Sequence, residues 1–217
     1  MNNKETELVC ILDKSGSMRG LEKDTIGGFN SLLEKQMKEA GAVRVTTVLF
    51  DHRYVLLHKR LPIMDVMPIT DKEYEAGGMT ALLDAVGRTI DMLKDTLKNR
   101  KKSEMPLVLF VIITDGEENA SKEYSLDTVR KKIEACKNDN TWEFLYLGAN
   151  VDAFAAASSI GINKGHTTQY HADQEGIRVN FEALNTTVAG MRCNQRLDET
   201  WKDMIDKDFI KRKNGKS

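Results

Sequence analysis

The chain has 217 residues, a length that fits one domain with a full hydrophobic core. Lysine and arginine total 32 and aspartate and glutamate total 33, so the net charge is −1 and no strong field attracts nucleic acid or an anionic membrane. Hydrophobic residues make up 41% and charged residues 30%, and only three residues are proline, which excludes a disordered or fibrous chain.

The sequence carries no sign of membrane insertion or export. Its longest apolar run, residues 107–113, is far shorter than the roughly 20 residues that span a bilayer. The first residues lack the basic start, apolar stretch and cleavage site of a signal peptide, and three widely spaced cysteines form neither a disulfide framework nor a zinc motif. We therefore expect a cytoplasmic protein whose partners include neither nucleic acid nor membrane.

Strand and helix patterns alternate along the chain. In order, they predict a strand at 8–12, a helix at 26–40, a hairpin of strands 43–50 and 54–60, a helix at 80–97, a strand at 107–113, a helix at 126–136, a strand at 142–147, a short Ala-rich helix at 153–160, a weak strand at 167–171 and a helix at 177–191. The basic residues 206–217 are expected to form a frayed terminus.

This alternation predicts a doubly wound, mostly parallel α/β sheet with helices on both faces and an antiparallel edge strand supplied by the hairpin. No linker or internal repeat divides the chain, so one domain is expected. In sheets of this kind, ligands bind beyond the carboxyl ends of the strands. The residues that follow the strands are therefore the first place to search for a site.

Three segments at or near the ends of strands carry oxygen-bearing side chains. The first strand runs into Asp13-Lys14-Ser15-Gly16-Ser17, the most apolar strand into Thr114-Asp115-Gly116, and Gly77-Gly78-Met79-Thr80 precedes a helix. In an extended loop, residues 13, 15 and 17 project to the same side. The candidate site residues are two carboxylates and three hydroxyls: Asp13, Ser15, Ser17, Thr80 and Asp115.

These oxygen ligands favour Mg²⁺ or Mn²⁺ over the metals that prefer imidazole or thiolate. Five small and mostly neutral side chains do not complete an octahedron, and Mg²⁺ keeps several waters, so one position is expected to stay open. A carboxylate from another protein would fill that position well, since it brings a full negative charge to the cation.

The pattern Asp-x-Ser-x-Ser at 13–17, Thr80 after paired glycines and Thr-Asp-Gly at 114–116 resembles the metal-ion-dependent adhesion site, or MIDAS, of von Willebrand factor A domains. The resemblance covers roughly residues 5–195 and leaves 196–217 as a helical, basic tail. It implies a Rossmann-like, six-stranded sheet of order 3-2-1-4-5-6. It also implies direct metal ligation by Ser15 and Ser17, ligation by Thr80 and Asp115 directly or through water, and a role for Asp13 through water and hydrogen bonds.

Other residues near the predicted rim are interpreted from their positions. Contact with a partner protein is expected from Met18, Arg19, His52, Met79 and Glu117. Asp84 is interpreted as a first-turn carboxylate that the helix dipole favours, Glu118 as part of a solvated loop, and the Ala-rich stretch 152–159 as a packed helix without a functional role.

Two other functions remain open at this stage. A magnesium-dependent phosphohydrolase of the haloacid dehalogenase type would use Asp13 as its nucleophile, but the second aspartate of such enzymes is Ser15 here. No nucleotide-binding or nucleophile-elbow motif is present, so the chain is not expected to be an enzyme. The other alternative is a scaffold that binds proteins without metal.

Overall fold

The computed structural model describes residues 4–139, 141–149, 152–194 and 196–214. Its centre is a six-stranded sheet of order β3-β2-β1-β4-β5-β6. Strands β2 and β3 pair antiparallel and all other neighbours pair parallel, which confirms the predicted sheet. The strands are β1 (Thr6–Asp13), β2 (Val43–Phe50), β3 (Tyr54–Pro62), β4 (Leu107–Thr114), β5 (Trp142–Gly148) and β6 (Thr167–Gln169).

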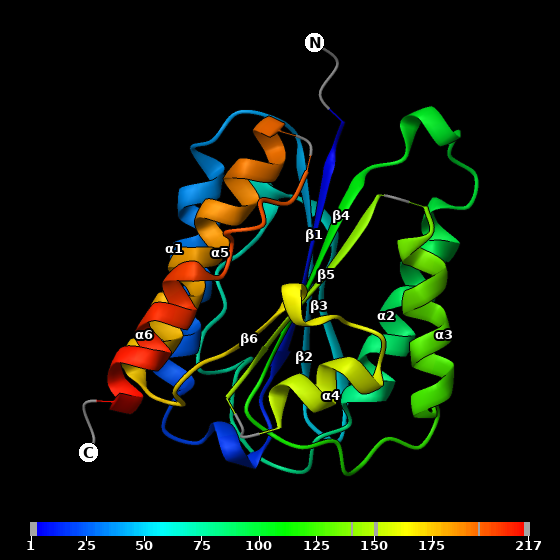
Figure 1. The fold of residues 1–217 in the computed structure, drawn as a ribbon. Helices are drawn as coiled ribbons and strands as arrows, with labels where there is room; N and C mark the ends of the chain where they lie inside the picture. Colours follow the sequence, from blue (N-terminus) through cyan, green and yellow to red (C-terminus); the bar gives the residue numbers. More distant parts are fainter. Residues whose placement is uncertain (1–3, 140, 150–151, 195, 215–217) are drawn as a thin grey trace.

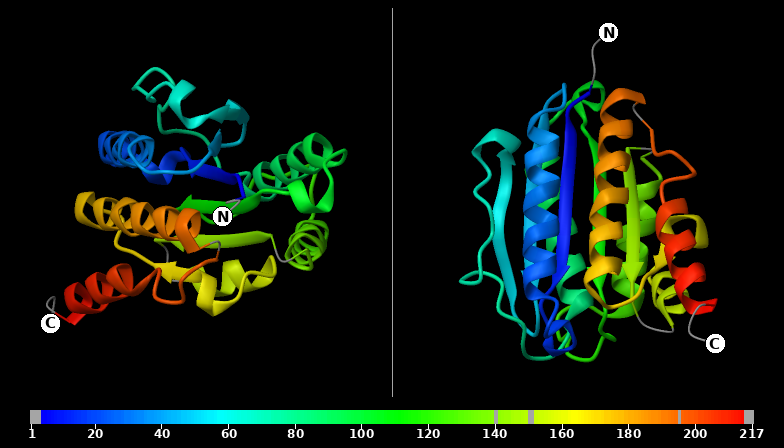
Figure 2. Two further views of the ribbon diagram at one scale, coloured as in Figure 1. Left: turned by 90° about the horizontal axis from the view of Figure 1, so that it is seen from above. Right: turned by 90° about the vertical axis from the view of Figure 1, so that its left-hand side faces the viewer.

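Helices cover both faces of the sheet (Figures 1 and 2). One face packs against α1 (Glu22–Met37), α5 (Gln174–Asn194) and α6 (Asp203–Asn214), and the other against α2 (Leu82–Leu97), α3 (Leu126–Lys137) and α4 (Ala153–Ser159). Each face has its own hydrophobic core. Among the described residues, no helix is long and apolar enough to cross a membrane.

Strands β1 and β4 lie at the centre of the sheet and are buried along their full lengths. Their side chains alternate between the two cores, which explains why both strands read as continuous apolar runs in the sequence. Because parallel strands point the same way, the carboxyl ends of β1 and β4 meet at one edge of the sheet, at the bottom of Figure 1. The candidate segments that begin at Asp13 and Thr114 both start from this edge.

The predicted helices and strands are present, with ends that shift by a few residues. The largest difference lies at the carboxyl end, where the frayed terminus expected over residues 206–217 is wrong for residues 206–214. These residues belong to helix α6, which lies beside β6. Trp201 and Ile205 are buried there, and the guanidinium of Arg212 forms an ion pair with Asp173 at 2.9 Å. The sparse apolar pattern hid the helix because it is held largely by polar contacts.

The outer edge of the sheet is irregular. The register of β3 on β2 shifts twice near Thr47, and Arg60 adopts a positive φ of 49°, which is rare for a residue with a side chain. The Arg60 guanidinium reaches across β2 and lies 2.8 Å from the buried carboxylate of Glu7 on β1. This ion pair joins the edge strand to the centre of the sheet, at the end opposite the candidate segments.

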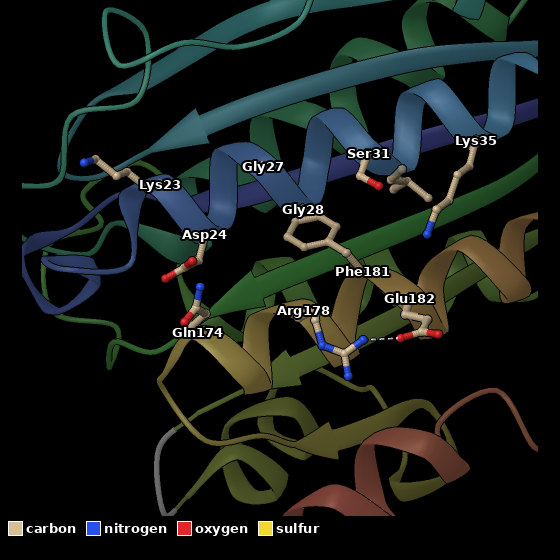
Figure 3. A pocket seen from close by; sticks show the side chains of 11 residues that line it. Lys23, Asp24, Gly27, Gly28, Ser31, Lys35, Gln174, Arg178, Phe181 and Glu182 are labelled. Carbon is tan, nitrogen blue, oxygen red and sulfur yellow. Dashed lines mark hydrogen bonds and ion pairs between the residues drawn. The ribbon is translucent and has the colours of Figure 1, made fainter.

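Helix α5 lies along α1, and the two helices contact each other through a glycine (Figure 3). A Cβ atom at Gly28 would lie 2.2 Å from Cδ2 of Phe181, so only glycine lets the aromatic ring rest on α1. The neighbouring Gly27 has no atom within 4 Å of the position of its missing Cβ. The shared groove carries side chains of both charges and is not built like a site for one kind of ion.

The two glycines of α1 therefore respond differently to alanine. We expect Gly27→Ala to stabilise the fold by about 0.5–1 kcal/mol, because alanine costs less backbone entropy in a helix and meets nothing. Gly28→Ala should destabilise it by roughly 1–3 kcal/mol, because the buried ring of Phe181 must move. Urea unfolding of both variants measures the difference; equal effects would contradict the packing described here.

Candidate metal site

The loop after β1 is organised by the carboxylate of Asp13. This side chain is 1% exposed, and one of its oxygens accepts a hydrogen bond of 2.7 Å from the backbone N–H of Ser15. The bond turns the chain so that the hydroxyls of Ser15 and Ser17 lie 3.0 Å apart. The loop does not stay fully extended, since residues 16–18 form a 3-10 turn, but the two hydroxyls still face the same region.

The loop after β4 supplies the second carboxylate. Asp115 accepts a hydrogen bond of 2.6 Å from the hydroxyl of Ser17, which joins the ends of β1 and β4 directly. Thr114 donates its hydroxyl to the other oxygen of Asp13 at 2.5 Å, so both oxygens of that buried carboxylate are engaged. The two central strands are thus tied together at the edge where the candidate side chains lie.

The predicted hydroxyls converge around Gly116. Three side-chain oxygens surround the place where a Cβ of Gly116 would lie: Oγ1 of Thr80 at 2.7 Å, Oγ of Ser17 at 3.1 Å and Oγ of Ser15 at 3.2 Å. Glycine keeps this space clear of a side chain. We call the region bounded by these three hydroxyls and Asp115 the cradle; it brings together four of the five predicted site residues, with Asp13 directly behind them.

Burial shifts the acidity of both carboxyls at this site. Loss of hydration raises the pKa of Asp13 to about 6, although hydrogen bonds from Thr114 and Ser15 oppose that effect. Burial also raises the pKa of Asp115, against the hydrogen bond from Ser17. The protein alone thus stabilises the two negative charges poorly, and a bound cation would favour the charged forms of both groups.

The donor set of the cradle fits a hard divalent cation. Within the described ranges, no three histidine, cysteine, aspartate or glutamate side chains gather as a metal site, so a typical zinc or copper cluster is absent there. The cradle instead offers three hydroxyls and the carboxylate of Asp115, with the carboxylate of Asp13 behind them, and oxygen-only sets of this kind suit Mg²⁺ or Mn²⁺. Asp115 is the one charged side chain in the cradle as defined above, so a bound divalent cation would keep part of its positive charge, which suits the binding of an anionic group.

Thr80 is positioned by the loop that follows Asp115. The backbone N–H of Thr80 donates to the Asn119 side chain at 2.9 Å, and the backbone N–H of Asn119 donates back to the Thr80 carbonyl at 3.0 Å. On the other side, Gly78 has a φ of 77°, and the ring of His52 packs where its Cβ would be. Gly78, the second of the paired glycines, thus adopts a backbone conformation that favours glycine.

Two carboxylates clamp this loop to the start of α2. Asp84 lies in the first turn of α2 as expected, whereas the interpretation of Glu118 as part of a solvated loop is wrong. Glu118 is not solvated: its oxygens accept hydrogen bonds from the N–H groups of Leu83 and residues 120–121 and from the Ser121 hydroxyl. Asp84 does more than complement the helix dipole, because it accepts three bonds of 2.9 Å from the N–H groups of residues 122–124. Thr80 and Asp115 are consequently held by one connected structure.

Sequence reasoning also missed a buried ion pair beside the cradle. The ammonium of Lys14, 5% exposed, lies 3.5 Å from the carboxylate of Asp51, which is fully buried. The backbone of Lys14 bonds to Phe50 on one side and Gly77 on the other. Hydrogen bonds from Arg53 and the charge of Lys14 outweigh burial and hold the pKa of Asp51 below its usual value. The apolar residues near Lys14 in the sequence do not indicate that the side chain of Lys14 is itself buried.

The predicted partner-contact residues divide into two groups. Arg19, His52, Met79 and Glu117 are exposed, and Met79 is 56% exposed, so each has surface that a partner can reach. Met18 is wrong as a contact residue, because it is 0% exposed and packs in the core under α1. The 3-10 turn at 16–18 rotates its side chain inward, a turn that the sequence pattern did not predict.

The comparisons with known proteins identify the fold of this chain, but they do not assign the chain to a protein family. No protein-family profile matches this sequence, and no curated protein sequence matches it significantly. Similar solved structures include the PilB minor pilin from Streptococcus sanguinis (TM-score 0.59, 12% identity, 87% of this chain and 62% of that chain) and a von Willebrand factor type A protein from Catenulispora acidiphila (0.56, 12%, 86% and 43%).

A third similar structure is proximal thread matrix protein 1 from the mussel byssus, described with a zinc-occupied MIDAS motif (TM-score 0.55, 13% identity, 86% of this chain and 46% of that chain). This chain spans between 43% and 62% of the lengths of the three proteins. At such low identities the likeness concerns the fold alone: the chain has the α/β fold of von Willebrand factor A domains.

The clamp on the loop after β4 leads to a stability prediction. Asp84→Ala removes the acceptor of three backbone N–H groups, and we expect a loss of roughly 2–4 kcal/mol in the free energy of unfolding. Asp95→Ala on the same helix is the control, because that carboxylate is exposed and forms a surface ion pair with Lys98. Chemical denaturation compares the two; a loss as small as that of the control would refute the clamp.

Proposed function

We propose that this chain is a protein-binding module that depends on a divalent metal. Ser15, Ser17, Thr80 and Asp115 would hold Mg²⁺ or Mn²⁺, with Asp13 fixing the loop behind them. A carboxylate from another protein would complete the coordination, so that the cation links the two proteins. The observation that carries the proposal is the convergence of three hydroxyls around Gly116, with the carboxylate of Asp115 hydrogen-bonded to one of them.

Three features support a binding role for this arrangement. The cradle lies at the edge of the sheet, and Ser17 is exposed, so a group from another molecule can approach it. The hydroxyls of Ser15 and Ser17 are placed by hydrogen bonds within the protein, which lowers the entropic cost of assembling a metal site. The similar mussel protein carries a zinc-occupied MIDAS motif, which makes a divalent metal a reasonable ligand for this fold.

The position of Asp13 argues against the phosphohydrolase alternative. A nucleophilic carboxylate needs an oxygen that can reach the substrate. Here the side chain is 1% exposed, and its oxygens accept hydrogen bonds from Ser15 and Thr114. Asp13 is better placed to orient the loop than to attack a phosphoester, so binding remains the function that we propose.

Magnesium titration tests the cradle directly. We expect wild-type protein to bind Mg²⁺, and Ser15→Ala and Gly116→Ala each to weaken binding by about 10- to 100-fold, one by removing a ligand and the other by filling the cradle with a methyl group. Gly77→Ala is the matched control, because its Cβ would meet no atom within 4 Å. Calorimetry gives the affinities, and equal affinity in all four proteins would refute the metal site.

The need for metal in protein binding is a separate prediction. If a partner carboxylate completes the coordination, proteins retained by the immobilised chain in Mg²⁺ should be released by a chelator, and the Ser15→Ala variant should not retain them. Quantitative mass spectrometry of the retained proteins, with Gly77→Ala as the reference, measures this effect. Retention that is unchanged by the chelator would instead support the metal-independent scaffold.

A further inference from the structure

A cavity lined mainly by basic residues lies at the end of the sheet opposite the cradle. It has a volume of about 670 Å³ and opens between the carboxyl end of α2, the loop that leads to β4 and the start of β5. In Figure 1 this end of the sheet is at the top, where β1 also begins. Because β4 has eight residues, roughly 25 Å separate this cavity from the cradle. We call it the amino-end cavity.

The lining of the amino-end cavity is strongly positive. Of the described residues that line it, only Asp139 is acidic, whereas five are basic: Lys4, Lys94, Lys98, Arg100 and Lys102. The chain as a whole has a net charge of −1, so its overall balance conceals a local excess of positive charge. Such an excess around a concave surface attracts an anion.

Two of the five basic side chains stand apart from the ion pairs around them. Lys98 pairs with Asp95 at 2.6 Å, and Arg100 pairs at 2.8 Å with a glutamate that precedes β1, so their charges are partly balanced. By contrast, Lys94 and Lys102 are exposed, and neither forms an ion pair within the part of the chain that the structure describes. No described carboxylate therefore neutralises these two ammonium groups at close range.

The inner side of the amino-end cavity is apolar. It is lined by Leu97 at the end of α2, Met105 before β4 and Trp142 at the start of β5. Leu97 and Trp142 are buried, and Met105 is half-buried against the same core. An aromatic group that lies on these residues would remove apolar surface from water. The volume of the cavity is typical of a pocket for a small molecule.

We propose that the amino-end cavity binds a small molecule that carries two or more phosphate groups on an aromatic body, as a nucleoside triphosphate does. The phosphate groups lie at Lys94 and Lys102, because lysine ammonium groups bind phosphate as compact point charges. The aromatic body lies on the apolar side of the cavity, at Met105. This binding site goes beyond the metal-dependent function and does not depend on it.

The distribution of charge favours a small ligand over a long polyanion. A strand of nucleic acid follows a groove or stripe of positive charge that continues along the surface. Here the basic residues gather around one cavity, and the exposed carboxylates of Asp95, Glu104 and Asp139 belong to the same segments. These carboxylates interrupt any continuous basic stripe, so the attraction is confined to the cavity.

Calorimetry in the presence of a chelator tests the proposal with ATP as the probe. The chelator removes divalent metal, so the cradle does not contribute to the binding. We expect ATP to bind about 10-fold more tightly than inorganic tripolyphosphate, because only ATP has an aromatic body for the apolar side of the cavity. An oligothymidylate decamer and hexaglutamate represent long polyanions, and both should bind more weakly than ATP.

A charge-reversed variant locates the phosphate groups. Lys94→Glu combined with Lys102→Glu replaces both exposed ammonium groups, and we expect the affinity for ATP to fall by about 30-fold or more. Lys38→Glu combined with Lys72→Glu makes the same change in net charge at exposed positions that do not line the cavity, so this control should bind ATP as wild type does. Circular dichroism shows whether both variants are folded.

Met105→Ala tests the apolar side of the cavity while leaving every charge in place. We expect the preference for ATP over tripolyphosphate to fall by about threefold, with the affinity for tripolyphosphate retained. An unchanged preference would overturn the proposed position of the aromatic body.

Three other results would overturn the proposal. If ATP does not bind, or binds no better than tripolyphosphate, the cavity does not recognise a phosphorylated aromatic molecule. Tighter binding of the decamer or of hexaglutamate would assign the basic surface to a macromolecule. Unchanged ATP affinity in the Lys94→Glu and Lys102→Glu variant would place ATP elsewhere. Because every measurement is made without divalent metal, these results are independent of whether the metal-dependent function holds.

Discussion

The buried carboxylate of Asp13 is the constraint on which the site depends. A charged group without water is costly unless it is hydrogen-bonded, and here the bonds come from the two central strands and their loops: Thr114 at the end of β4 and Ser15 just beyond β1. Satisfying one side chain therefore fixes the relative position of two loops. Tyr74 adds a third attachment, donating its buried hydroxyl to the Asp13 carbonyl.

The remaining parts of the cradle are held from outside it. On one side, Asp84 and Glu118 fasten the loop after β4 to α2, so the segments that carry Thr80 and Asp115 are joined. On the other side, the Lys14–Asp51 pair joins the loop after β1 to the β2–β3 turn. These contacts do not touch the cradle hydroxyls. They restrict the motion of the segments that bear them, which is how a site of weak neutral ligands is kept assembled.

The fold, and the convergence of the residues that follow the strands, could be predicted because both depend on local patterns. Apolar runs and helical spacing indicate the elements, and in a parallel sheet the residues after the strands meet at one edge. The hydrogen bonds that hold the cradle segments in place could not be predicted. Asp84 and Glu118 make them with residues that lie 35 or more positions away in the sequence. The burial of Met18 was not predicted because a tight turn leaves no periodic apolar pattern in the sequence. Helix α6 lacks such a pattern as well, because polar contacts help to hold it in place.

The irregular edge strand has a consequence for how the domain meets other molecules. A regular outer strand exposes evenly spaced N–H and C=O groups on which a foreign strand can assemble. Strand β3 breaks that spacing at its register shifts and at the left-handed Arg60, whose guanidinium is anchored inward on Glu7. The edge is therefore a poor template for strand exchange. The irregular strand β3 thus hinders the sheets of neighbouring molecules from pairing through their edge strands.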